Sequence, residues 1–303
     1  MKLIIDTDPG IDDAMAIAYA AAAPEIDLIG LTTVFGNTLI DQSSRNARFL
    51  LDKLNLTVPV SQGASWAWGR DSHRASVHVH GPEGFGDVTD IPDLGKNHHM
   101  PAAEYLVEMA RCHKGQLTVC AVGPLTNIAD AIALDPAFSS NLARLVIMGG
   151  AVFCRGNVTQ HAEANIHNDP IAAQSVFDRP PETVLVGLDV TMQTLYQGSD
   201  FDALAKQSPD FGGFLRDISD FYLRFYQDIA DQDGCGLHDS TAVIACSHED
   251  MFETVETGVR VVQDGPSVGR TVPDPNRPAI KVCQDVDAVG VVNLFTERLS
   301  SLP

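Results

Sequence analysis

The chain has 303 residues, and its 40 acidic side chains outnumber its 20 lysines and arginines, which gives a formal net charge of -20 at pH 7. So negative a chain is not built to bind nucleic acid or an anionic membrane surface. With 45% hydrophobic and 20% charged residues, it has the composition of a folded globular protein, which excludes disordered and collagen-like chains. The length, without any linker-like stretch, predicts one α/β domain over residues 1–303.

Apolar strands alternate with helical segments along the chain. Residues 3–6 form a short apolar run, and the Ala-rich segment 11–23 that follows ends before Pro24. The same order of strand and helix returns further on, with apolar runs at 26–36, 58–63, 117–123, 144–150 and 183–190. Apolar strands that alternate with helices predict a mostly parallel central sheet, flanked by helices on both faces.

The cysteines and the apolar run at 14–23 indicate in which cellular compartment the protein is expected. The six cysteines are scattered and lack CxxC spacing, which favours reduced thiols in a cytoplasmic protein over three disulfides. The run at 14–23 follows four aspartates rather than basic residues, and it is too short to span a bilayer. We therefore expect a buried helix there and no contact with membranes.

Polar residues gather where the predicted strands end. They occupy positions 6–13, 36–37, 123–127 and 148–150, each at the carboxyl end of an apolar run. In parallel sheets the active site lies at the carboxyl ends of the strands, because loops and helix amino ends converge there. The long segment 64–99 is rich in Gly, His and Trp, and we expect it to serve this site as well.

Four aspartates fall within eight residues, at positions 6, 8, 12 and 13. One interpretation is structural: the later two favour the dipole of the following helix, and the earlier two cap the turn. The chemical interpretation is a hard divalent cation bound by carboxylate oxygens, which offsets the repulsion among the acids. Asp239 joins this set if the fold brings it to the first turn; otherwise it is an N-cap.

Two families begin with acids at the end of the first strand. Asp6-Thr7-Asp8 fits the DxD of haloacid-dehalogenase-like phosphohydrolases, although Gly10 and the second acid pair depart from that pattern. DTDPGIDDA at 6–14 closely resembles the metal-binding segment of the inosine-uridine-preferring nucleoside hydrolases. Further segments similar to that family follow in order: VFGN at 34–37, HVHGPEG at 78–84, AVGPLTNIA at 121–129, LVIMGGAVFCRGN at 145–157, AEAN at 162–165, GLDVT at 187–191 and LHDSTAV at 237–243.

This resemblance implies Ca²⁺-dependent hydrolysis of the N-glycosidic bond of small-molecule ribonucleosides, giving ribose and free base. It implies that Asp8 is the general base and a Ca²⁺ ligand, together with Asp13, Asp239 and the backbone carbonyl of Val122. His238 would protonate the leaving base, since histidine titrates in a useful range. The resemblance also implies substrate contacts by Asp12 at the 2′-hydroxyl, Asn37 near the water, His80 beside the base, Met148 against the sugar, Asn157 and Glu163 at the 5′-hydroxyl, and Asn165 near the 3′-hydroxyl.

Several points stay open at this stage. Ala164 stands where relatives often carry Phe, and Ser240 where they carry Pro, so the preference among purine, pyrimidine and broad substrates is not determined. Residues 225–236 are expected to form a lid, with Tyr226 or Gln227 on the base. The family implies a homodimer or homotetramer. The alternatives are the phosphohydrolase and a nucleoside-binding protein without catalysis.

Overall fold

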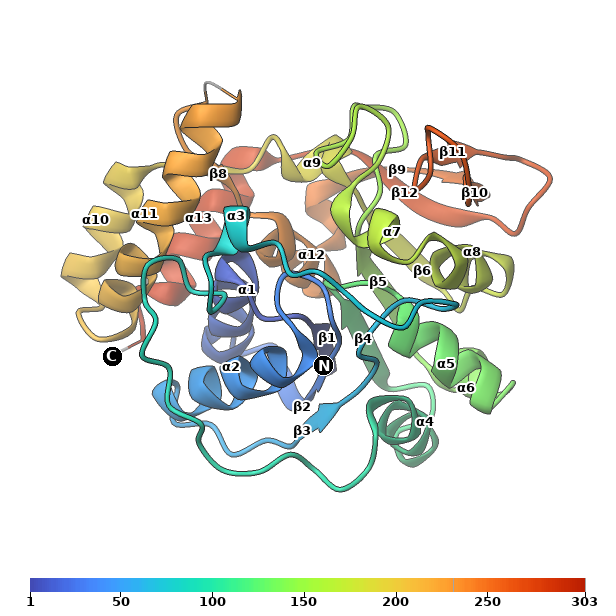
Figure 1. Cartoon of the computed structure of the whole chain (residues 1–303), viewed down its shortest axis with the longest axis horizontal. Coiled ribbons are helices and arrows are strands. Elements are labelled where there is room, and N and C mark those ends of the chain that lie inside the picture. Colours follow the sequence, from blue (N-terminus) through green and yellow to red (C-terminus); the bar gives the residue numbers. More distant parts are fainter. Residues whose placement is uncertain (231, 303) are drawn as a thin grey trace.

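The computed structural model describes residues 1–230 and 232–302, and its centre is an eight-stranded sheet with the order β3-β2-β1-β4-β5-β6-β12-β9 (Figure 1). All neighbours from β3 to β12 are parallel. The strands of this sheet are β1 Lys2–Thr7, β2 Asp27–Thr33, β3 Val60–Gln62, β4 Leu117–Ala121, β5 Arg144–Met148, β6 Thr183–Val186, β9 Phe252–Thr257 and β12 Ile280–Val286. The predicted fold class, a mostly parallel sheet flanked by helices, is confirmed. Each of β2 to β6 lies within a run that the sequence identified, and β1 extends one residue beyond each end of the predicted run at 3–6.

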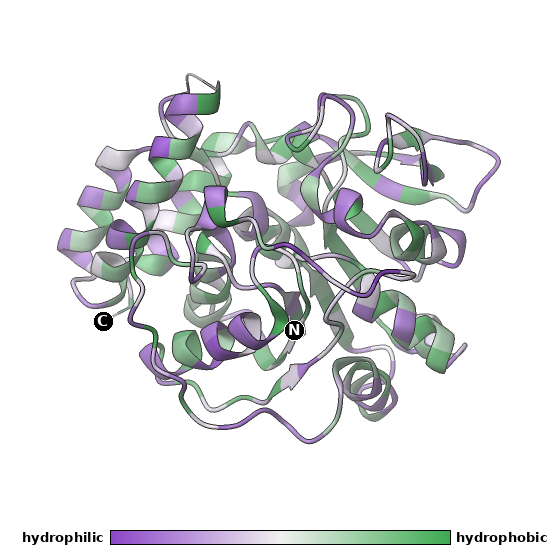
Figure 2. Ribbon diagram, viewed as in Figure 1, coloured by the Kyte–Doolittle hydropathy of each residue, from purple (hydrophilic) through white to green (hydrophobic). Residues whose placement is uncertain are grey.

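Helices cover both faces of the sheet because successive side chains of its strands point in opposite directions. Leu3 and Ile5 pack into the larger apolar core, whereas Ile4 packs into the other one. The helices of the larger core are α1 Ile11–Ala22, α2 Ile40–Lys53, α10 Gly198–Gln207, α11 Phe211–Ala230, α12 His238–Ser247 and α13 Ala288–Leu299. The helices of the other core are α4 Ala102–Cys112, α5 Thr126–Leu134, α6 Phe138–Asn141 and α8 Pro170–Asp178. Figure 2 shows the apolar strands at the centre and polar residues on the outer helices.

The sheet continues beyond the predicted strands. β12 extends it parallel to β6, and β9 closes the edge antiparallel to β12. The sequence of β9, FETVET, carries exposed glutamates and is not an apolar run of the kind that identified the other strands. An edge strand accommodates such residues because only one of its sides is covered. One antiparallel edge strand is compatible with the mostly parallel sheet that the sequence predicts.

The remaining elements are short and lie around the sheet. They are α3 Val77–His80, α7 Ala164–Asn168, α9 Leu188–Thr191, η1 Glu249–Met251, the strand pair β7 Leu195–Tyr196 with β8 Cys235–Gly236, and the pair β10 Val259–Val261 with β11 Thr271–Pro273. The segment 64–99 contains α3, which carries His80 to the carboxyl ends of the strands. Among the helices that the structure describes, none is both long and apolar enough to cross a membrane.

Candidate active site

The turn between β1 and α1 is packed tightly against His80. A methyl group placed on Gly10 would lie 2.6 Å from His80 Nδ1, so only glycine fits beside the ring in this arrangement. The backbone N–H of Ile11 donates a hydrogen bond to the same nitrogen at 3.2 Å. Burial lowers the pKa of His80 to about 4, so the ring is neutral at pH 7 and can accept this bond. The contact joins the long segment 64–99 to the first turn of the fold.

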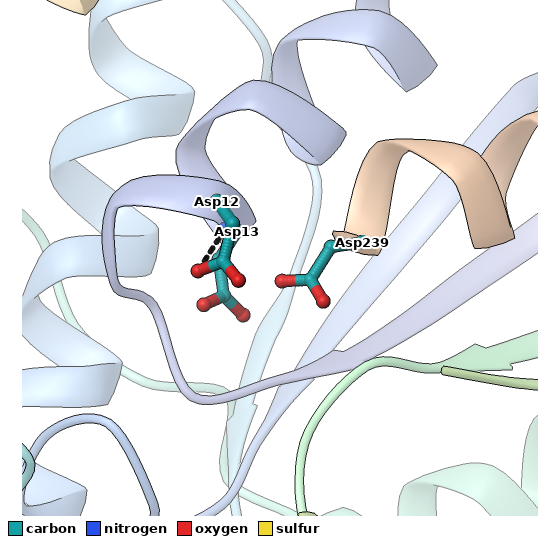
Figure 3. Close-up of side chains that lie close together, drawn as sticks. All are labelled: Asp12, Asp13 and Asp239. Atoms are coloured by element: carbon teal, nitrogen blue, oxygen red, sulfur yellow. Dashed lines mark hydrogen bonds between the residues drawn. The ribbon is translucent and has the colours of Figure 1, made fainter. Parts of the chain in front are cut away.

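Three carboxylates from the first turns of two helices meet at this end of the sheet. Asp12 and Asp13 open α1, Asp239 opens α12, and Figure 3 shows Asp239 pointing toward the other two. One oxygen from each of the three lies within 4.8 Å of the others, and all three side chains are buried. The fold thus brings Asp239 to the aspartates of the first turn, although more than 200 residues separate them in the sequence.

The hydrogen bonds around the cluster leave two carboxylate oxygens without a partner. Asp13 Oδ2 accepts from the backbone N–H of Gly10 at 2.9 Å and from the side-chain amide of Asn37 at 3.0 Å. Asp8 Oδ2 accepts from the backbone N–H of Asn37 at 2.6 Å. Asp8 Oδ1 and Asp239 Oδ2 are buried and accept no hydrogen bond from the described residues. Such oxygens are costly to bury unpaired, and a bound cation would satisfy them.

Burial and like charge both disfavour the ionised forms of these acids. Burial, followed by the charge of Asp13, raises the pKa of Asp8 well above its ordinary range. Burial, followed by the charge of Asp12, does the same to Asp239. Burial raises the pKa of Asp12 and of Asp13 to about 6. No lysine or arginine in the described chain forms an ion pair with any of the four, so their donor set fits a hard divalent cation.

The backbone carbonyl of Val122 lies at the end of β4 beside this cluster. It accepts a hydrogen bond from Asn165 Nδ2 at 2.8 Å, and the same nitrogen lies 3.2 Å from the carbonyl oxygen of Met148. A carbonyl oxygen has two lone pairs, so this bond leaves Val122 free to bind a cation with the other. Asn165 therefore joins the ends of β4 and β5 at the floor of the site.

Glu163 and Asn157 stabilise the start of α7. The Glu163 carboxylate accepts from the backbone N–H groups of Asn165 at 2.7 Å, Ile166 at 3.0 Å and Gly150 at 2.9 Å. Asn157 Oδ1 accepts from the backbone N–H of Ala164 at 3.0 Å. A carboxylate offers about four lone-pair positions. Glu163 therefore keeps one acceptor position beyond its three structural bonds, while the Asn157 amide nitrogen stays available as a donor.

A cavity of about 870 Å³ opens above the carboxylates, and all but two of the predicted site residues line it. They are Asp12, Asn37, His80, Val122, Met148, Asn157, Glu163, Asn165, His238 and Asp239. Asp8 and Asp13 do not line the cavity and are fully buried. The sequence thus predicted residues that the fold brings together at one place.

His238 opens α12 and is held at both ring nitrogens. Its Nδ1 lies 2.7 Å from Thr191 Oγ1, and its Nε2 lies 2.5 Å from Tyr226 Oη. Burial lowers the pKa of His238 to about 4, so the ring is neutral at pH 7. A neutral imidazole has one donor and one acceptor nitrogen, and a hydroxyl group satisfies either.

One face of α11 forms a wall of the cavity that sequence reasoning identified only in part. Tyr222, Phe225, Tyr226 and Ile229 line the cavity, at the i, i+3, i+4 and i+7 spacing of a helix face. The Tyr222 hydroxyl donates to Asp12 Oδ2 at 3.4 Å. The spacing was visible in the sequence as a helical stripe, but nothing in it distinguished a cavity wall from a buried core face.

Part of the predicted lid over 225–236 belongs to this wall. Tyr226 lines the cavity, whereas Gln227 is exposed and is not among the described residues that line it. Residues 225–230 form the end of α11, and 235–236 form β8. Asp231, which the predicted lid includes, lies outside the described residues.

Comparisons with known proteins agree with this site. The family model described as inosine-uridine preferring nucleoside hydrolase matches residues 3–293. A protein of Arabidopsis thaliana named probable uridine nucleosidase 2 is 39% identical, over 98% of this chain and 97% of its own length. A solved plant nucleoside hydrolase superposes with a TM-score of 0.96 at 35% identity, covering 99% of each chain. The purine-preferring ribonucleoside hydrolase of Gardnerella vaginalis gives a TM-score of 0.95 at 36% identity, over 99% of this chain and 98% of its own.

The match spans nearly the whole sequence and includes every segment that contributes to the cavity. The phosphohydrolase alternative needs a lysine for the phosphate group, and no lysine lines the cavity among the described residues. The chain belongs to the inosine-uridine preferring nucleoside hydrolases, enzymes that hydrolyse ribonucleosides to ribose and free base.

Proposed function

We propose that the chain hydrolyses ribonucleosides with the help of a Ca²⁺ ion held by Asp8, Asp13, Asp239 and the carbonyl of Val122. The observation that carries this proposal is the pair of buried, unpartnered oxygens, Asp8 Oδ1 and Asp239 Oδ2, beside a cluster of like charges. When bound, the cation supplies charge that orients a water and the ribose hydroxyls and lowers the pKa of that water. Carboxylate and carbonyl oxygens are the ligands that Ca²⁺ prefers.

Asp12 belongs to the close carboxylate cluster, yet its oxygens already have partners. Asp12 Oδ1 accepts from the backbone N–H of Asp13 at 3.2 Å, and Asp12 Oδ2 accepts from the Tyr222 hydroxyl. Asp12 also lines the cavity, which Asp8 and Asp13 do not. These contacts support a role for Asp12 at the ribose 2′-hydroxyl rather than as a primary cation ligand.

Two residues carry the proton transfers of this reaction. Asp8 accepts a proton from water as the water oxygen bonds to the anomeric carbon of the ribose. The bond from that carbon to the base nitrogen breaks, and His238 gives a proton to the departing base. Because burial keeps its ring neutral at pH 7, His238 takes up this proton from solvent when the nucleoside binds. Asn37, Asn157, Glu163 and Asn165 hold the sugar, with Met148 against its ring and His80 beside the base. All of these side chains except Asp8 line one cavity, and Asp8 is buried with an unpartnered oxygen, which supports the assignment.

We also propose a cytoplasmic homodimer or homotetramer. The six cysteines, which form no disulfide with one another in the described chain, support a reducing compartment. The family resemblance supports the assembly. Sedimentation of the purified protein measures its subunit number, and localisation of the tagged full chain tests the compartment.

A substrate panel tests the sugar and base assignments together. Inosine, adenosine, guanosine, uridine and cytidine are compared by the absorbance change on base release, with 2′-deoxyuridine as the matched control for uridine. Removing the 2′-hydroxyl takes a partner from Asp12, and leaving buried polar groups unpaired can separate analogues by about 10⁴-fold. We expect much lower kcat/KM for 2′-deoxyuridine than for uridine, and equal values would contradict the assigned sugar geometry.

A further inference from the structure

Thr191 contacts the histidine that faces the base. Its hydroxyl lies 2.7 Å from His238 Nδ1, on the side of the ring opposite to Tyr226. Thr191 is the last residue of α9 and fully buried, and His238 is 3% exposed. The bond therefore joins two elements that follow different strands, α9 after β6 and α12 after β8, in a place that water does not reach.

The surrounding backbone restricts the ring to this orientation. A methyl group placed on Gly236 would lie 2.8 Å from His238 Cε1 and 2.9 Å from Nε2. The ring is thus packed against Gly236 while its two nitrogens are bonded to hydroxyl groups. Tyr226 lines the cavity, so the Nε2 edge of the ring faces the substrate side and the Nδ1 edge faces the protein.

A hydroxyl suits the Nδ1 position better than a fixed donor or acceptor. It can accept a hydrogen bond when Nδ1 carries a proton and donate one when it does not. The contact therefore persists while the other nitrogen exchanges its proton with the base. In the described chain the Thr191 hydroxyl forms no other hydrogen bond that competes with this one.

We propose that Thr191 is a positioning residue for base protonation: its hydroxyl holds the His238 ring so that Nε2 is directed toward the leaving base. This inference rests on the proposed role of His238 as the acid. Among the described residues Thr191 does not line the cavity, and its hydroxyl bonds His238 rather than a proposed cation ligand. Its effect should therefore be confined to substrates that need a proton on the leaving group.

Thr191→Val removes the hydroxyl and keeps the shape of the side chain. We expect the turnover of the best natural nucleoside to fall about 10- to 100-fold, as when the partner that orients a functional histidine is lost. A riboside with a p-nitrophenolate leaving group departs as a stabilised anion and should be cleaved at nearly the original rate. Thr191→Ser should restore nucleoside turnover, because it returns the hydroxyl.

Thr194→Val is the matched control, since Thr194 is equally buried and its hydroxyl bonds Thr191 O at 3.1 Å and Thr241 Oγ1 at 2.8 Å, not His238. We expect it to retain nucleoside turnover. If Thr191→Val fails to fold, Thr191→Ser and Thr191→Ala give the same comparison, because they differ only in the hydroxyl.

The inference is overturned if Thr191→Val slows both substrates equally, if it leaves nucleoside turnover unchanged, or if Thr194→Val has the same selective effect. His238→Ala separates this failure from failure of the proposed function. Selective loss on nucleosides in His238→Ala, without such loss in Thr191→Val, leaves the acid role standing and removes the role of Thr191. No selective loss in His238→Ala removes the acid role itself.

Discussion

Asp8 has the contacts and the environment that a general base needs beneath a sugar site. One of its oxygens accepts the backbone N–H of Asn37 at 2.6 Å, which fixes the carboxylate, while the other has no partner. Burial raises its pKa, so its affinity for a proton exceeds that of an exposed aspartate. Asp8 therefore combines a fixed position with a free oxygen.

The substitution Asp8→Asn keeps the shape of the side chain and one oxygen but cannot accept a proton. We expect turnover of uridine and inosine to fall by at least ~10²-fold, the lower end of what a positioned base contributes. Asp6→Asn is the matched control, because Asp6 is equally buried but its Oδ1 accepts hydrogen bonds from Thr32 and Asn127. Asp8 instead accepts from Asn37, which also bonds Asp13. Turnover close to the original in Asp8→Asn would show that another group is the base.

At the residue scale the sequence predicts neighbours of two kinds and misses a third. It predicts residues that share a turn, such as Asp12 and Asp13, and residues placed by strand ends, such as Asn37, whereas the place of Asp239 comes from the family resemblance. It cannot predict the bond between Tyr222 and Asp12, whose positions differ by 210. That contact depends on the angle at which α11 crosses the cavity, and helical spacing alone does not determine this angle.

The turn from β1 into α1 shows how an element depends on one small residue. Because a methyl group on Gly10 would lie 2.6 Å from His80 Nδ1, Gly10→Ala must move the ring or the turn. We expect the free energy of unfolding to drop by about 1 to 3 kcal/mol, typical of overpacking in a tight core. Urea denaturation followed by circular dichroism measures this change.

Gly213→Ala serves as the control for that substitution. Gly213 lies in α11, and a methyl group placed there would meet nothing within 4 Å. Alanine favours a helix over glycine by about 1 kcal/mol, so this variant should be as stable as the original protein or more stable. If Gly10→Ala kept both its free energy of unfolding and its turnover, the turn could hold a methyl group beside His80, which would contradict the tight packing inferred for this turn.

At the scale of elements, four of the six strands that the sequence identified are buried along nearly their whole length. Such strands are continuous apolar runs, and β1, β4, β5 and β6 fit this description. The edge strand β9 is half exposed and mixes glutamate with apolar residues, so its pattern does not stand out. Short helices such as α9 are also missed, because four residues are too few to show a helical period.

For the whole molecule, the buried acids of the site link stability to pH and to the cation. In the metal-free protein, burial raises the pKa of Asp12 and Asp13 from 3.8 to about 6, and that of Asp6 to about 7. The folded state therefore binds more protons than the unfolded chain between these values. The contribution of these groups to the free energy of unfolding is therefore fully present below their pKa in the unfolded chain. It is lost as the pH rises through their pKa in the folded protein.

We expect the melting temperature of the metal-free protein to decrease as the pH rises from 5 to 8. The decrease should be smaller with Ca²⁺, because the cation binds the ionised carboxylates. Differential scanning calorimetry at constant ionic strength measures both series. Asp239→Asn removes one of the coupled charges and should flatten the metal-free series. A metal-free melting temperature that stays constant or rises over this range, or a decrease that is equally steep in Asp239→Asn, would contradict the linkage.

The most direct test of the account is nucleoside turnover after the divalent cation is removed and returned. The protein is chelated exhaustively, its metal content is verified, and uridine and inosine hydrolysis are measured before and after Ca²⁺ is added. Because Asp8 and Asp239 each retain an unpartnered buried oxygen, we expect the metal-free protein to be inactive and Ca²⁺ to restore its turnover. Full turnover in verified metal-free protein would contradict the proposed cation site.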